Sequence, residues 1–194
     1  MGFLDTLLGR SKPVRPDLDQ LFGLPSAAVT LQAAAGFQPT GEGSVCFAAV
    51  EGGAFAQARE EVQGLLDADV ETGGIPVEFH QDDYHYTWLL SRHTPDDVAG
   101  LVNDLHAVNT ILQDGGFGPQ LLCSLVGFRN AEGQSLALVY LYKRGTFYPF
   151  APRPGEKRDN ALELQIKAMV ANDLRVEDDL SRWFPVWGAP GIAD

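Results

Sequence analysis

Residues 121–150 read LLCSLVGFRNAEGQSLALVYLYKRGTFYPF, and this stretch decides the fold. It contains two long runs in which both alternating sets of residues are largely apolar, and a third, shorter run follows Gly145. A polar turn at 130–133 separates the first two runs, as is usual in a hairpin. Strands that are apolar on both sides belong in the middle of a sheet with something packed on each face. The stretch therefore predicts a buried hairpin at the centre of the molecule.

A hairpin followed by a helix occurs twice along the chain, over residues 75–114 and again over 121–172. A strand and a helix come before the first copy. This order predicts an α+β fold, with an antiparallel sheet of five to six strands and long helices mainly on one face. It is similar to the order of elements in the secretion-chaperone-like and YbjN-like folds. Their members are usually binding modules, but a fold alone does not fix a function.

The first hairpin has a specific predicted register. A two-residue turn at 82–83 places Val77 opposite Trp88 on one face and His80 opposite His85 on the other. Two imidazoles with a nearby carboxylate are a suitable ligand set for a divalent metal. Polar side chains are nevertheless ordinary at an exposed hairpin tip. We therefore keep His80 and His85 only as weak metal candidates, and expect no metal and no other cofactor.

Composition bounds the class of protein. The chain has 194 residues and a formal net charge of -12, which makes nucleic acid an unsuitable partner because phosphate binding needs a basic face. Cys46 and Cys123 lie in apolar runs and share no CxxC spacing, which is typical of buried free thiols in a reducing compartment. No apolar run has the length of a membrane span, and no signal peptide is visible. These features predict a cytoplasmic protein.

The chain divides into three parts: a short amphipathic segment with a proline linker at 1–16, a single α+β domain at 17–180, and an aromatic tail at 181–194. Three side chains make the tail too aromatic for a disordered end: Trp183, Phe184 and Trp187. We expect the tail to pack on the domain. Presentation of these aromatic side chains to a partner protein is the alternative.

The N-terminal segment combines an apolar stripe with basic residues. A two-turn helix would gather four apolar side chains on one side: Phe3, Leu4, Leu7 and Leu8. Arg10 and Lys12 follow the stripe. Such a segment suits contact with an anionic membrane surface or docking on a partner helix. So short a helix is marginal alone in water, so a frayed end, or a helix folded back on its own domain, is equally open.

The remaining candidate for catalysis is weak. His106 lies on the polar flank of a predicted helix, and only a chance alignment with Cys123 would give a thiol–histidine pair. No GxSxG surrounds a serine, and no phosphate-binding glycine motif is present. The sequence therefore predicts no catalytic residue and favours a protein that is not an enzyme.

Several stretches together resemble the actinobacterial family of PspA-associated proteins called PspAB: MGFLDTLLGR (1–10), GSVCF (43–47), DLHAVN (104–109), GFGPQLLCSLVGF (116–128), YLYKRGTFYPFAP (140–152), RDNALELQ (158–165) and RWFPVWGAPG (182–191). The resemblance covers essentially the whole chain. It implies an accessory of the phage-shock envelope-stress system, which centres on the membrane-remodelling protein PspA. It also implies a link to the membrane protease HtpX. It brings no catalytic residue with it.

The resemblance and the residues together predict a non-enzymatic adaptor that acts by protein–protein contact, with PspA or a related envelope-stress protein as partner. Contact with the inner face of the membrane remains a role for the N-terminal segment. One alternative is a small metal-dependent or hydrolytic enzyme that uses surface histidines. Another is a secretion-chaperone-like module that binds a peptide. The sequence leaves the oligomeric state open.

Overall fold

The computed structural model describes residues 16–68 and 70–192. Its centre is a six-stranded sheet in the order β2-β3-β1-β4-β5-β6, and every neighbouring pair is antiparallel. The strands are β1 (Gln38–Ala48), β2 (Glu78–Gln81), β3 (Tyr86–Arg92), β4 (Leu121–Arg129), β5 (Ser135–Leu141) and β6 (Thr146–Phe150). A small two-stranded hairpin, β7 (Pro152–Arg153) and β8 (Lys157–Arg158), follows β6.

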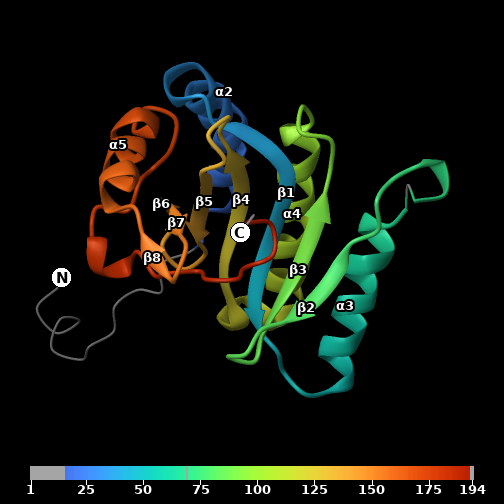
Figure 1. Ribbon diagram of the computed structural model, residues 1–194. Helices are drawn as coiled ribbons and strands as arrows, with labels where there is room; N and C mark the ends of the chain where they lie inside the picture. Colours follow the sequence, from blue (N-terminus) through green and yellow to red (C-terminus); the bar gives the residue numbers. More distant parts are fainter. Residues whose placement is uncertain (1–15, 69, 193–194) are drawn as a thin grey trace, which may run out of the picture.

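The α-helices of the described residues are α2 (Leu24–Ala35), α3 (Gly53–Leu66), α4 (Val98–Leu112) and α5 (Asn160–Val170). Short helical turns are η1 (Leu18–Gly23), η2 (Val70–Thr72), η3 (Gln113–Phe117), η4 (Gly118–Gln120) and η5 (Leu180–Arg182). The α-helices lie on one side of the sheet, with the C-terminal segment on the other (Figure 1). The predicted α+β class, with an antiparallel sheet and helices on one face, is confirmed.

The quoted stretch forms the predicted central hairpin, β4 and β5. Leu138 of β5 faces the helices, and Val139 faces the opposite side of the sheet. A β-bulge interrupts the pairing of β1 with β4 where Cys46 pairs with Cys123 and Phe47 pairs with Leu121. In a regular strand, residues two positions apart face the same side of the sheet. The bulge instead turns Leu121 toward the helices and keeps Cys123 on the opposite face. Both faces of this hairpin are therefore buried.

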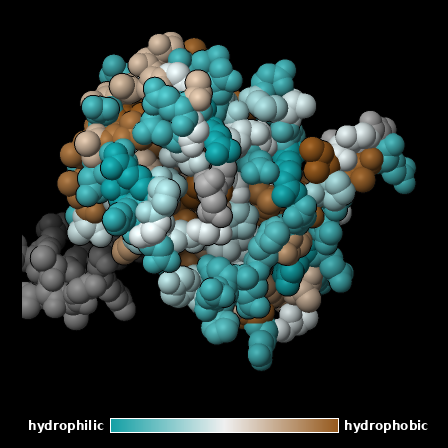
Figure 2. All heavy atoms as spheres, in the orientation of Figure 1, coloured by the Kyte–Doolittle hydropathy of each residue, from teal (hydrophilic) through white to brown (hydrophobic). Residues whose placement is uncertain are grey.

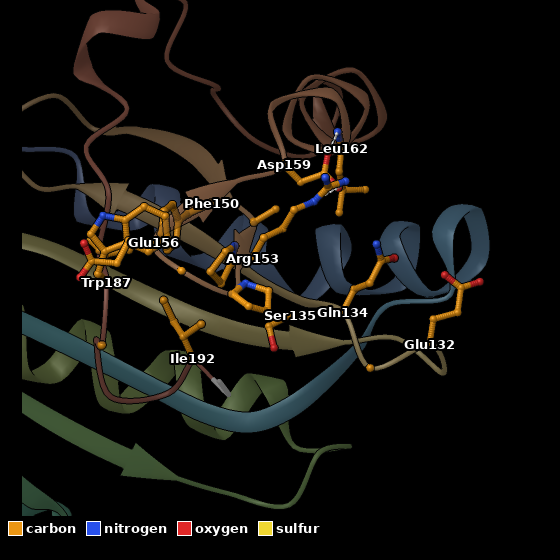
Figure 3. Close-up of a pocket in the computed structure, with 17 residues that line it drawn as sticks. Glu132, Gln134, Ser135, Phe150, Arg153, Glu156, Asp159, Leu162, Trp187 and Ile192 are labelled. Carbon is orange, nitrogen blue, oxygen red and sulfur yellow. Dashed lines mark hydrogen bonds and ion pairs between the residues drawn. The ribbon is translucent and has the colours of Figure 1, made fainter.

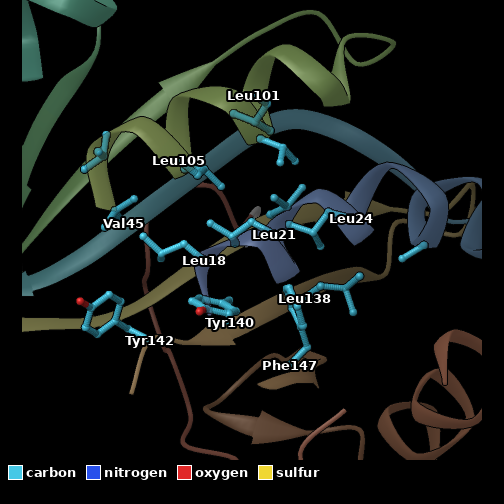
Figure 4. Packing of buried hydrophobic residues seen from close by; sticks show 14 of the residues in the cluster. Leu18, Leu21, Leu24, Val45, Leu101, Leu105, Leu138, Tyr140, Tyr142 and Phe147 are labelled. Atoms are coloured by element: carbon cyan, nitrogen blue, oxygen red, sulfur yellow. The ribbon is translucent and has the colours of Figure 1, made fainter. Parts of the chain in front are cut away.

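A large apolar core fills the space between the sheet and the helices. Leu18 and Leu21 of η1 insert between α4 on one side and β5 and β6 on the other (Figure 4). Leu105 of α4 and Tyr140 of β5 close this layer, and none of these four side chains exceeds 8% exposure. The Tyr140 hydroxyl donates to the Asp17 carbonyl at 2.9 Å, which satisfies the polar end of the ring.

Local sequence signals explain where three helices begin or end. Asp97 and Asp159 cap α4 and α5, with side chains that accept from the backbone N–H of Gly100 and Leu162. Gly36 ends α2 with φ 69°, a left-handed conformation that glycine adopts at little cost. Each of these three boundaries thus has a local cause in the sequence.

The predicted register of the first hairpin is wrong. His80 pairs with Trp88 rather than with His85, and Val77 lies on the helix face, opposite to Trp88. The physical cause is Asp82, whose carboxylate accepts from the indole N–H of Trp88 and from the backbone N–H of Tyr84 and Tyr86, all at 2.9 Å. These bonds stabilise a wider turn in which His85 has φ 66°.

Candidate functional site: an aromatic groove beside the C-terminal tail

The tail, residues 183–192, covers part of the sheet face that carries no helices. Figure 1 shows this segment crossing in front of the strands. Trp183 is 6% exposed, and its indole N–H donates to the Glu177 carbonyl at 3.0 Å. Its ring stacks on Tyr148 with 6.0 Å between the centroids, and the Tyr148 hydroxyl donates to the Phe184 carbonyl at 2.7 Å. Side chains of the sheet therefore hold the tail by its main-chain carbonyl groups.

The far end of the tail is held in the same way. The Ser44 hydroxyl of β1 donates to the Pro190 carbonyl at 2.7 Å. Gly127 of β4 lies directly beneath, and a Cβ atom at this position would stand 2.0 Å from the Gly191 carbonyl oxygen. A side chain does not fit there, so glycine permits the close approach of tail and sheet.

A buried carboxylate anchors the start of the tail. Glu177 is 3% exposed, and it accepts from the Thr146 hydroxyl at 2.8 Å and from Arg144 at 3.3 Å. Arg182 lies 3.5 Å from its other oxygen. Burial raises the pKa of Glu177, but the hydroxyl, a backbone N–H and the Arg144 guanidinium lower it more, so the net pKa is below the usual value.

Beside the tail, the same sheet face is hollowed into a groove of about 650 Å³, which we call the aromatic groove. Tyr84 and Phe184 on its walls are 75% and 59% exposed, which is unusual for large side chains of this kind. Its lining comes from β1, β3, β4, β5, β6, the two turns 82–85 and 142–145, and the tail: Cys46, Asp82, Tyr84, Tyr86, Trp88, Leu122, Cys123, Leu141, Lys143, Arg144, Tyr148, Arg182, Phe184, Pro185, Val186 and Trp187.

The two cysteines line the groove as a cross-strand pair. Cys46 and Cys123 are direct neighbours on β1 and β4, and both are buried free thiols. The Cys123 thiol raises the pKa of Cys46, and burial raises it further. A thiol with a raised pKa is a poor nucleophile at neutral pH because only the thiolate reacts. The geometry thus favours an inert pair and not a catalytic one.

The charged residues of the groove are mostly cationic. Three of the four are basic, and we call them the cationic rim: Lys143, Arg144 and Arg182. The fourth, Asp82, is already bound by three N–H donors of its own turn. The chain as a whole has 26 acidic and 14 basic side chains. Arg144 and Arg182 are paired with Glu177, so Lys143 is the cation of the rim that makes no ion pair with a described residue.

A second hollow, the hairpin cavity, lies on the other side of tail residues Val186 and Trp187 and has a volume of about 680 Å³. Figure 3 shows Arg153 reaching from the β7–β8 hairpin toward Asp159 at the start of α5. These two form an ion pair, with 3.0 Å between Arg153 Nε and Asp159 Oδ2. The Trp187 ring packs edge-on against the Phe150 ring, with 4.9 Å between the ring centroids. Among the described residues that line this cavity, the one basic side chain, Arg153, is thus already paired with a carboxylate.

A histidine that sequence reasoning missed makes the densest polar cluster. His93 places Nδ1 at 2.8 Å from Asp97 Oδ2 and Nε2 at 2.7 Å from Asp104 Oδ2. Burial lowers the pKa of His93, but the two carboxylates raise it more, so the net pKa is above the usual value. The Ser91 hydroxyl donates to Asp104 and not to the ring. Both ring nitrogens face carboxylates, so the ring is not placed to activate the serine. The seven-residue spacing of Asp97 and Asp104, two helical turns, was the available signal.

The structure separates the histidines named for metal binding and catalysis. His80 bonds Glu78 at 3.0 Å, and His85 is a turn residue that does not pair with it. His106 packs against the Phe22 ring at 4.7 Å on the helix side of the sheet, whereas Cys123 faces the tail. The Cys123–His106 pair is therefore not formed. Across residues 16–68 and 70–192, no group of three or more His, Cys, Asp or Glu side chains is arranged to hold a metal ion.

The predicted contact residues fall into three groups. Those of the N-terminal segment lie outside the described residues: Phe3, Leu4, Leu7, Leu8, Arg10 and Lys12. Trp183 is buried under the tail, and Trp187 is half-buried beside it. Phe184 alone of the three tail aromatics is largely exposed. Every helix in the part of the chain that the structure describes is too short or too polar to cross a membrane.

The fold and the groove together define a class: a helix-backed antiparallel domain whose other sheet face carries a groove with exposed aromatic side chains. The chain belongs to the family of PspA associated protein B, PspAB, whose family model matches residues 1–191 of 194. The family description links the chain to PspA. Neither a curated protein nor a solved structure matches it.

Proposed function

We propose that this protein is a non-enzymatic adaptor of the PspA envelope-stress response, and that it binds a partner protein through the aromatic groove. The observation that carries the proposal is the exposure of Tyr84 and Phe184 on the walls of a hollow whose floor is apolar. Figure 2 shows this side of the molecule mostly hydrophilic, with hydrophobic atoms in small separate areas. A confined aromatic surface of this kind is typical of a protein-binding site.

The choice of an adaptor over an enzyme rests on the chemistry available near the groove. The Cys46 thiol has little thiolate character, because its pKa is raised by the Cys123 thiol and by burial. The histidines of the enzymatic alternative lie on different elements: His80 on β2, His85 in a turn and His106 on α4. Aromatic side chains, in contrast, dominate the binding energy of many protein interfaces.

PspA is the partner we propose first, because the family description names it. An envelope protease of the HtpX type is a second partner, which only the resemblance of the sequence supports. The N-terminal segment adds a contact with partner or membrane in this proposal. Its stripe of Phe3, Leu4, Leu7 and Leu8 would reinforce a groove-bound partner or hold the complex at an anionic surface.

The test is direct binding of purified full-length protein to purified PspA by isothermal titration calorimetry. The groove variant is Tyr84→Ala with Phe184→Ala, and the matched control is Val29→Ala with Leu164→Ala. The control residues are also large, apolar and exposed, but lie on α2 and α5. We expect the groove variant to weaken binding roughly thirtyfold or more, since truncating even one aromatic hot spot costs about 2 kcal/mol.

The control variant should bind within about twofold of the wild type, as expected for residues outside an interface. Equal losses from both variants, or no binding of PspA to the wild type, would count against the proposal. A version that lacks residues 1–12 separates the two contacts. If it binds PspA normally but no longer binds anionic liposomes, the segment contacts the membrane; if it loses PspA, the segment contacts the partner. Salt should weaken the liposome contact.

A further inference from the structure

The tail shows what kind of chain this sheet face accepts. Residues 183–192 run across the strands without forming a helix or a strand of their own, apart from tight turns. Their apolar side chains, Trp183 and Ala189 among them, pack on the sheet. Side chains of the sheet donate to their carbonyl groups, as Tyr148 does to Phe184 and Ser44 to Pro190. The face thus binds a non-helical aromatic segment by main-chain carbonyls and apolar side chains.

The aromatic groove continues the surface on which the tail is seated. Phe184, Pro185, Val186 and Trp187 form one wall of the groove, so a second segment in the groove would lie beside the tail in the same layer. The hydroxyl groups of Tyr84 and Tyr86 line the groove and have no hydrogen-bond partner within residues 16–68 and 70–192. They can donate to carbonyl groups in the way the Tyr148 hydroxyl does. The volume of about 650 Å³ is in the range that takes up a small ligand or a few side chains.

The cationic rim adds a charge preference. Arg144 and Arg182 are 42% and 39% exposed, and both are held by carboxylates: Arg144 Nε and Arg182 Nη1 lie 3.3 Å and 3.5 Å from the buried Glu177, and Arg182 Nε lies 3.6 Å from Asp179. Lys143 is exposed and makes no ion pair with any described residue. Guanidinium groups held in place in this way bind carboxylates with less loss of side-chain freedom. A carboxylate on the incoming segment would be attracted to the rim, and an ammonium group would be repelled.

We propose that the aromatic groove binds an extended, non-helical segment of a partner protein that carries aromatic or branched apolar side chains and has a carboxylate next to them. The bound segment lies in the groove alongside Phe184–Trp187 and packs on the sheet as the tail does on the neighbouring strands. Its acidic residue lies at the cationic rim. The inference rests on the proposed function in treating the groove as a protein-binding surface. It adds the chemistry and the conformation of the bound segment.

The probe is a short fluorescent peptide with alternating Trp and Val and two Glu residues at one end, titrated against the full-length protein by fluorescence anisotropy. A second peptide has Lys in place of Glu, and a third has Pro at two inner positions to prevent a helix. We expect the Lys peptide to bind roughly fivefold more weakly at low salt, from two rim ion pairs of about 0.5 kcal/mol each. The Pro peptide should bind within about threefold of the first.

The charge-reversal variant Lys143→Glu tests where the acidic end lies. Lys143 is exposed, so we expect the variant to fold normally, whereas replacing either arginine would leave Glu177 buried without its partner. The variant should weaken the Glu peptide and strengthen the Lys peptide by roughly threefold each. The matched control, Lys157→Glu, is exposed on β8 outside the groove and should change neither affinity. Equal effects of both variants would overturn the assignment of the rim.

Other outcomes overturn separate parts. If the Glu and Lys peptides bind equally, the segment has no acidic end. If the Pro peptide loses binding tenfold or more, the bound segment is helical. PspA binding that depends on the groove, combined with either of these results, would leave the proposed function standing without this inference. If the peptides show the expected preferences but PspA does not bind, this inference stands and the proposed function falls. Absence of binding by all three peptides would overturn the inference.

Discussion

The substitution Gly127→Ala tests whether the tail is seated on the sheet as described. A Cβ atom at this position would stand 2.0 Å from the Gly191 carbonyl oxygen, while ordinary contact begins at 3.4 Å, so tail or strand has to move by about 1.4 Å. Overpacking of this kind costs about 1–3 kcal/mol. The shift also strains the Ser44–Pro190 hydrogen bond of 2.7 Å, worth about 1 kcal/mol.

Replacing a strand glycine by alanine returns about 0.5–1 kcal/mol through the lower entropy of the unfolded chain. We therefore expect Gly127→Ala to lower the free energy of unfolding by roughly 1–3 kcal/mol in urea titrations followed by tryptophan fluorescence. Gly64→Ala is the matched control. It lies in α3 with no atom within 4 Å of the added Cβ, and it should stabilise by about 0.5–1 kcal/mol.

A chain that ends at residue 188 completes the test as a double-mutant cycle, because it lacks Gly191. In this shortened chain, Gly127→Ala should cost much less, because the remaining close neighbour of the added Cβ is the Thr40 hydroxyl at 3.0 Å, the end of a side chain. If the substitution costs the same with and without the end of the tail, the contact between Gly127 and Gly191 is not the cause, and the described seating of the tail is refuted.

Three further predictions concern ionisable groups. The two carboxylates raise the pKa of His93 above its usual value. The contribution of His93 to the free energy of unfolding should therefore be complete below the unfolded pKa of about 6.5 and be lost as pH rises through the folded pKa. In urea titrations, the free energies of unfolding of wild type and His93→Gln should differ only at acidic pH. The Glu177 pKa is lowered, so its stabilisation should be lost as pH falls through the folded pKa, and Glu177→Gln should destabilise by about 2–3 kcal/mol at pH 7 and show no such acid loss. Cys46 and Cys123 should react with iodoacetamide far more slowly in the folded protein than in urea, by mass spectrometry; equal rates would contradict their burial.

Much of the fold could be predicted because local and periodic signals agree with it. Residues 121–150 are apolar on both alternating sets, and the structure buries both faces of that hairpin. Asp97 and Asp159, which cap α4 and α5, are acids just before apolar helical patterns. Such signals depend on neighbouring residues alone, so a single sequence is enough to read them.

The failures arose where a side chain sets the backbone. Asp82 organises the β2–β3 turn through three N–H donors, and a pattern of apolar residues does not carry that information. The resulting shift separates His80 from His85 and removes the basis for a shared metal. The bulge opposite Cys46 was hidden for a different reason. Both alternating sets of residues in β4 are apolar, so one extra residue does not disturb the apolar pattern.

The candidate site could not be predicted as a unit. Its lining comes from five strands, two turns and the tail, and Tyr84 and Phe184 lie a hundred residues apart in the sequence. The aromatic tail was recognised as a contact element, but sequence alone gave no reason to separate Trp183, which is buried, from Phe184, which is exposed. That difference depends on the stacking of Trp183 on Tyr148.

The most direct test of a groove-bound partner is photo-cross-linking in the native cells. The full-length protein would carry Phe184→p-benzoylphenylalanine in the groove wall or, as the control, Leu164→p-benzoylphenylalanine on α5. Both positions are at least half exposed, so the two photoreactive groups differ in their place on the protein and not in their exposure to solvent. We expect position 184 to cross-link PspA under envelope stress and position 164 not to do so. Cross-links to PspA from position 164 alone, or from neither position, would contradict the groove as the site of partner binding.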